Sequence, residues 1–261
     1  MLLEELALKV NRQAKDFLVG LGEELESSSE KPIDFLRALN EPISKNYPYR
    51  FLGEHDSLKK GLLTYKKTRD QGVLDVAQNI GEYDKEETWI FVPEVGLWIA
   101  DTFNSSCEST GGDPYLRMFL TEIFSKVELI HTHPDKSLKQ QYNDGVRGRH
   151  YLIEGATPTS SDLVSLTQQQ AQSSKGSEVA GGIIGHYGLC IYEMSEVNLR
   201  LREGGACAGC DPKTINPKGN PVREIHKLLK NQAKRAQMVQ FSDQNIPAFD
   251  FGFVAYSEMG D

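Results

Sequence analysis

Apolar positions over residues 114–126 recur at the spacing of a one-sided helix. Leu116, Phe119, Leu120, Ile123 and Phe124 follow the i, i+3, i+4, i+7, i+8 pattern, which places them on one face of an α-helix. A short apolar run, residues 127–130, comes directly afterwards and has the length of a buried strand. The pattern therefore predicts a helix that packs on a sheet, followed at once by a strand of that sheet.

Similar patterns extend this expectation to a mixed α/β chain. We expect a helix from residue 159 onward, strand structure over residues 179–185 and 187–192, a helix near residues 223–239 and a closing strand over residues 249–256. The segments group into a helical N-terminal module (residues 1–75), an α/β core (residues 76–200) and a C-terminal extension of loop, helix and strand (residues 201–261).

Composition narrows the classes of partner. The chain has 261 residues, 39% of them hydrophobic, and a formal net charge of −8. It can bury a sizeable core, and its acidic balance argues against a broad nucleic-acid interface. No apolar run has the length of a membrane span. Glu4 and Glu5 stand where a secretory signal carries positive charge, and four cysteines suit a reducing compartment, so we expect a cytoplasmic protein.

Candidate chemistry begins at the end of the apolar run 127–130, where the chain reads His131-Thr132-His133-Pro134. Side chains two apart in a strand share one face, so both imidazoles can close on a single metal ion. Catalytic zinc commonly takes three protein ligands and leaves one position for water. The two histidines therefore predict a zinc site that needs a third ligand.

Asp162 is the preferred third ligand. It lies in the first turn of the helix expected from residue 159, where the helix dipole favours the ionised carboxylate that a metal requires. The alternative is purely structural, because Thr159-x-x-Asp162 is also close to a capping box that would begin a helix with no metal nearby.

The combination of H-T-H-P and P-T-S-S-D-L resembles the JAMM, or MPN-plus, metalloprotease family, whose signature is an upstream Glu, H-x-H-P and S-x-x-D. The resemblance covers about residues 86–195 and implies an MPN-like mixed sheet flanked by helices. Thr159 stands in the position of the family's Ser, and residues 135–158 form an insertion where the family has seven residues. Asp144 is nearer to the short spacing and is the rival third ligand, although Asp144-Gly145 is typical of a turn.

The resemblance also implies the remaining catalytic roles. A glutamate upstream of the histidines would act as general base, and Glu94, in the Glu-x-Gly that precedes an apolar run, is the residue we expect to serve. Glu86, Glu87 and Glu108 are competitors, and an isolated Glu can also be a solvated surface residue. Thr159 would help to bind the oxyanion of the tetrahedral intermediate.

Together these features predict a zinc-dependent isopeptidase or peptidase that acts on the C-terminal tail of ubiquitin or a ubiquitin-like protein. A non-catalytic MPN-type scaffold and a hydrolase of small molecules or short peptides are the alternatives. We expect the polar and basic insertion to lie beside the cleft and contact the substrate. Cys207-x-x-Cys210 is a weak metal signal, and a Gly-rich turn is the simpler interpretation.

Overall fold

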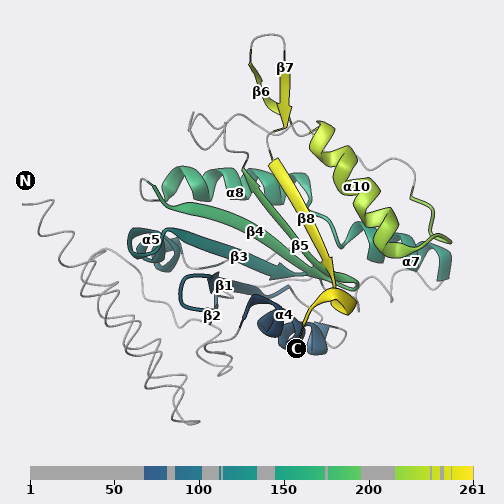
Figure 1. Cartoon of the computed structure of the whole chain (residues 1–261), viewed down its shortest axis with the longest axis horizontal. Helices are drawn as coiled ribbons and strands as arrows, with labels where there is room; N and C mark the ends of the chain where they lie inside the picture. Colours follow the sequence, from purple (N-terminus) through teal and green to yellow (C-terminus); the bar gives the residue numbers. More distant parts are fainter. Residues whose placement is uncertain are drawn as a thin grey trace, which may run out of the picture.

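One six-stranded sheet organises the part of the chain that the structure describes, and helices cover both of its faces (Figure 1). The structure is a computed structural model that describes residues 68–80, 86–101, 112, 114–133, 145–173, 176–194, 215–235, 237–241, 244–247 and 249–260. The expected N-terminal module, Asp144, Glu108 and the cysteine pair Cys207 and Cys210 lie outside these residues, apart from the last few positions of the module.

The strands of the sheet run in the order β2-β1-β3-β4-β5-β8. Their bounds are Thr88–Val92 (β1), Leu97–Ala100 (β2), Lys126–Thr132 (β3), Glu178–Gly185 (β4), Gly188–Met194 (β5) and Phe249–Ala255 (β8). Only β3 and β4 are parallel neighbours, and the other four pairs are antiparallel. The sheet is therefore mixed, as expected, and its parallel pair needs a long crossover connection.

Two helices form most of that crossover, α7 (Gly145–Glu154) and α8 (Ser160–Gln172). Together with α10 (Pro221–Arg235) they cover one face of the sheet, where Ile153, Leu163 and Leu166 join Ile183 and Ile225 in a buried cluster. Apolar residues spaced three and four apart on each helix make this face possible.

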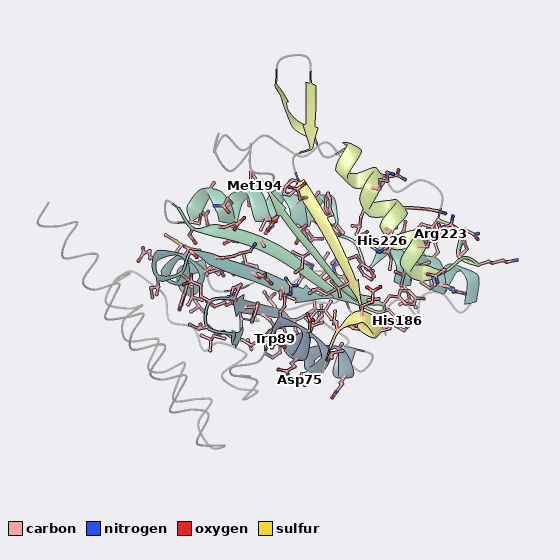
Figure 2. The ribbon with its side chains drawn as sticks, in the orientation of Figure 1. Asp75, Trp89, His186, Met194, Arg223 and His226 are labelled. Atoms are coloured by element: carbon pink, nitrogen blue, oxygen red, sulfur yellow. The ribbon has the colours of Figure 1, made fainter. Side chains whose placement is uncertain are left out.

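The opposite face of the sheet is covered by α4 (Arg69–Ile80). Val73 and Val76 of this helix pack against Trp89, Phe91 and Ile130, and Trp89 lies between β1 and α4 in Figure 2. The expected helix over residues 114–126 is observed as α5 (Pro114–Ile123), which packs against β3. Its apolar positions Leu116 and Leu120 are buried, which confirms that part of the expected core.

The C-terminal segment completes this sheet. β8 pairs with β5 along its whole length, from Gly188 opposite Ala255 to Met194 opposite Phe249. His226 of α10 meets the ring of Phe253 edge-on at 5.8 Å. A small hairpin, β6 (Gln237–Phe241) and β7 (Gln244–Pro247), precedes β8, and a short 3-10 helix (Tyr256–Glu258) follows it. The segment expected as an extension thus supplies an edge strand and a covering helix of the core.

The second half of the expected insertion is regular structure. Residues 145–154 form α7, Ile153 of this helix is fully buried, and Arg149 donates a hydrogen bond to the Gly219 carbonyl at 3.0 Å. The expectation of a segment without a packed core is therefore wrong for this half. In the part of the chain that is described, none of the helices has the length and apolar character needed to cross a bilayer.

Candidate metal centre

The two histidines lie at the end of β3, on the face of the sheet that α8 covers. His131 pairs with Thr88 of β1 on one side and Ile183 of β4 on the other. The backbone N–H of His133 donates to the Ile184 carbonyl at 3.1 Å, which extends the parallel pairing past the strand end. Because alternate residues share a face, this pairing directs both imidazoles to the same side.

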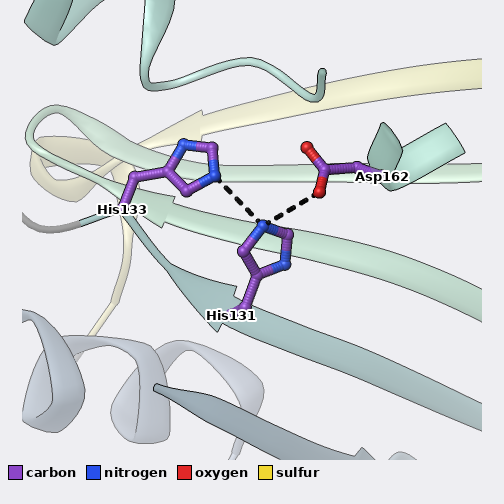
Figure 3. Close-up of side chains that lie close together, drawn as sticks. All are labelled: His131, His133 and Asp162. Atoms are coloured by element: carbon purple, nitrogen blue, oxygen red, sulfur yellow. Dashed lines mark hydrogen bonds and ion pairs between the residues drawn. The ribbon is translucent and has the colours of Figure 1, made fainter. Parts of the chain in front are cut away.

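The third expected ligand arrives from α8. Asp162 is in the first turn of the helix, and its Oδ1 lies 3.4 Å from His131 Nε2, while the two histidine Nε2 atoms are 3.1 Å apart (Figure 3). One ligand atom from each of the three residues lies within 4.8 Å of the others. Tetrahedral zinc with ligands at about 2 Å holds neighbouring ligand atoms roughly 3.3 Å apart. The cluster can therefore hold a metal ion without rearrangement of the backbone.

The carbonyl of Gly155 orients His133. It accepts a hydrogen bond from His133 Nδ1 at 2.7 Å, so the proton stays on Nδ1 and the Nε2 lone pair faces the cluster. Gly185 allows this contact, because a Cβ there would lie 3.0 Å from the Ala156 Cα and 3.1 Å from the Gly155 oxygen. The end of the insertion thus orients one of the candidate ligands.

Thr159 orients Asp162. It is the N-cap of α8, and both its backbone N–H and its hydroxyl donate to Asp162 Oδ2 at 2.7 Å. The hydroxyl also accepts from the Asp162 N–H at 3.3 Å. Capping and metal binding were alternatives in the sequence, but here Oδ2 completes the capping box while Oδ1 faces His131. Since the single hydroxyl proton of Thr159 is used on Asp162, the structure gives this residue a positioning contact instead of a free oxyanion donor.

Burial keeps His131 neutral. Desolvation lowers the pKa of His131 to about 4, and positive charge on His133 and Arg117 acts in the same direction, against the opposing effect of Asp162. A neutral imidazole has the lone pair that a metal requires. Cys190, on the neighbouring strand β5, is buried, and burial raises the pKa of its thiol, so it is not a reactive nucleophile.

The structure separates Glu94 from the cluster. Glu94 lies in the turn between β1 and β2, and its Oε1 accepts hydrogen bonds from the Ser125 N–H at 2.6 Å and the Ser125 hydroxyl at 2.8 Å. Ser125 comes just before β3, whereas His131 is near its end, about 20 Å away at the rise of a strand. The antiparallel pairing of β1 with β3 causes this separation, because it sends the turn after β1 to the start of β3 (Figure 1).

Glu86, a competitor of Glu94 in the sequence, lies beside the histidines instead. It precedes β1 and shares the face of Thr88, which is opposite His131. Glu86 and Thr88 line the same cavity as His131, His133 and Asp162, and Glu86 is 9% exposed. The structure therefore brings a nearly buried carboxyl group to the cavity of the candidate ligands.

Sequence analysis did not find Arg117 as a site residue. This side chain of α5 lines the same cavity, and its Nε donates to Asp101 Oδ2 at 2.8 Å. A single cation within an apolar helical stretch was the available signal, but its partner Asp101 is distant in sequence. Comparisons with known protein families, curated proteins and solved structures found no match for the chain.

Proposed function

We propose that this protein is a zinc-dependent peptidase or isopeptidase of the JAMM type, with His131, His133 and Asp162 as zinc ligands. The observation that supports the proposal most strongly is that these three donors and Glu86 meet in one cavity. Two imidazoles and one carboxylate are a common ligand set of catalytic zinc. When bound, zinc would polarise the scissile carbonyl and lower the pKa of a water molecule.

Glu86 is the general base in this proposal. Its carboxylate takes a proton from the attacking water and later delivers it to the leaving amine, which balances the hydrolysis. The nearly complete burial of Glu86 suits this role, because removal of water raises the proton affinity of a carboxylate. Thr159 keeps Asp162 oriented through its hydroxyl, and Gly155 keeps His133 in one tautomer.

The substrate in this proposal is an extended tail of ubiquitin or a ubiquitin-like protein. Such a tail can bind by adding a strand to an exposed sheet edge. The first strand in the sheet order is β2, and within the described residues no further strand pairs with its outer edge. Its neighbour β1 pairs with β3, the strand that carries the candidate ligands.

Zinc content and turnover test the proposal together. We expect one zinc per chain in the wild type and loss of stoichiometric zinc on His131→Ala or His133→Ala. Glu86→Gln should retain zinc but lose at least 100-fold in kcat on a ubiquitin-like fusion, because an amide cannot move the proton (roughly 10² or more for a general base). Glu94→Gln is the matched control and should retain wild-type kcat.

Two results would contradict these assignments. Full zinc in the His131→Ala/His133→Ala double variant would remove the metal centre. Wild-type turnover by Glu86→Gln together with its loss in Glu94→Gln would assign the base to the residue at the opposite end of β3.

A further inference from the structure

The cavity beside the candidate metal centre extends away from it. It has a volume of about 260 Å³ and lies between the face of the sheet and α8. His131 and Asp162 line one end, whereas Arg117, Gln169 and Tyr192 belong to a deeper level. The register shows this level: Leu129 pairs with Gly181, and Gly181 pairs with Tyr192. Leu129 precedes His131 by two residues, or about 7 Å along the strand.

Arg117 brings an incompletely paired positive charge to that level. Its side chain is 13% exposed, and its Nε is held by Asp101, whose side chain is fully buried. Within the described chain, Nη1 and Nη2 of Arg117 have no protein acceptor. A nearly buried guanidinium with unpaired donors is costly unless an anion completes it, and its planar fork matches a carboxylate.

Tyr192 adds a second donor at the same level. It is 3% exposed, and its ring packs on Gly181, where a Cβ would come within 2.3 Å of the ring. Burial raises the pKa of Tyr192 well above its usual value, so the hydroxyl keeps its proton. Among the described residues, this hydroxyl has no hydrogen-bond partner, although the residue lines the cavity. Burial without a partner is unusual for a tyrosine hydroxyl.

Gln169 supplies a third donor from α8. It lies two turns after Asp162, about 10 Å along the helix axis, and it lines the same cavity. Its side-chain amide has no partner within the described chain. Three elements, α5, β5 and α8, thus present polar groups that lack acceptors at one end of the cavity, while the acidic Glu86 and Asp162 belong to the cavity's metal-ligand set and its proposed base.

We propose that the deep end of the cavity is a carboxylate subsite, in which Arg117, Tyr192 and Gln169 bind the free C-terminal carboxylate of a peptide. The inference rests on the proposed peptidase function and names its substrate class. The cavity is smaller than the roughly 300–1,000 Å³ of ordinary ligand pockets, so it accepts only the last one or two residues. The reaction is then removal of a short C-terminal segment: the C–N bond breaks, hydroxide joins the carbonyl carbon, and a proton goes to the leaving amine.

Paired substrates test the subsite on the full-length, zinc-loaded protein. N-acetylated peptides with a free C-terminal carboxylate should have a KM at least tenfold lower than the same peptides with a C-terminal amide, because hydrogen bonds to a charged group are among the strongest (about tenfold or more). An amidated peptide ending in glutamate distinguishes a side-chain carboxylate as the source. Tyr192→Phe and Gln169→Leu should each remove much of the preference for the free acid, whereas Val164→Ala, an exposed position of α8, should not.

Calorimetric titration of the metal-free protein with N-acetylglycine gives a readout that needs no turnover. Arg117→Gln alone would leave Asp101 buried without its cation, so the double variant Asp101→Asn/Arg117→Gln removes both charges. We expect N-acetylglycine to bind the wild type and Val164→Ala but neither the double variant nor Tyr192→Phe. Binding with no turnover would retain the subsite and overturn the peptidase. Equal KM for acid and amide, equal affinity in Tyr192→Phe, or a KM advantage only for the glutamate side chain would overturn the subsite.

Discussion

Thr159 links helix capping to metal affinity, and Thr159→Val separates it from both. Valine keeps the shape but removes the hydroxyl, so the bond to Asp162 Oδ2 at 2.7 Å and the cap on the Asp162 N–H at 3.3 Å are lost. The backbone N–H of Thr159 still donates to Asp162 Oδ2 at 2.7 Å, so Asp162 loses only one of these two hydrogen bonds.

Two magnitudes follow from these contacts. Loss of an N-cap hydroxyl should lower the free energy of unfolding by about 1 kcal/mol. Loss of a contact that orients a ligand typically costs 10–100-fold in metal affinity, and we expect about tenfold because the backbone contact remains. Urea denaturation of the metal-free protein measures the first quantity, and zinc competition with a chromophoric chelator measures the second.

Thr159→Ser is the matched control, because serine retains the hydroxyl and is a good N-cap. It should restore both quantities to near the wild-type values. A Thr159→Val protein that is destabilised but binds zinc with wild-type affinity would refute the coupling and leave Thr159 as a helix cap alone. Wild-type stability in that variant would refute the cap itself.

Two further predictions concern the opposite face and the insertion. Glu128 is buried, pairs with Arg69 at 3.5 Å and has an Oε2 without a hydrogen-bond partner within the described chain, and desolvation raises its pKa above 4.5. The folded protein therefore loses stability as the pH rises above about 4.5, so Glu128→Gln should raise the free energy of unfolding at pH 7 by about 1 kcal/mol and lose this gain at pH 4; a gain that is equal at both pH values would disprove the role of ionisation. Replacing residues 137–144 with a short Gly-Ser linker, which spares α7, should leave zinc affinity unchanged and raise KM for the ubiquitin-like fusion. Unchanged KM would show that this segment does not touch substrate, and loss of zinc would identify Asp144 as a ligand.

The ligand cluster was predictable from sequence because local geometry determines it. Strand alternation alone puts His131 and His133 on one face, and the Thr159-x-x-Asp162 pattern alone begins a helix with Asp162 in its first turn. The outcome differs from the two alternatives in the sequence only in that one carboxylate serves the cap and faces the histidines at once.

The position of the general base was not predictable in the same way. Whether Glu86 or Glu94 reaches His131 depends on the direction and register of β1 against β3, and residues about forty apart in sequence carry no local signal of that register. Arg117 is a similar case. Its role depends on a pair with Asp101 that forms only when the end of β2 and α5 pack together.

The hydrogen bond from His133 to Gly155 and the ion-binding position of Asp162 give the crossover between β3 and β4 a second role. A metal held by His133 and Asp162 would tie the beginning of that connection to its end, much as a disulfide closes a loop, and closure of a long loop removes entropy mainly from the unfolded chain. Zinc would then act as a fastener for α7 and for the first turn of α8 as well as a reagent. Loss of the ion would be felt as protease sensitivity along residues 134–158 before it is felt anywhere else in the sheet.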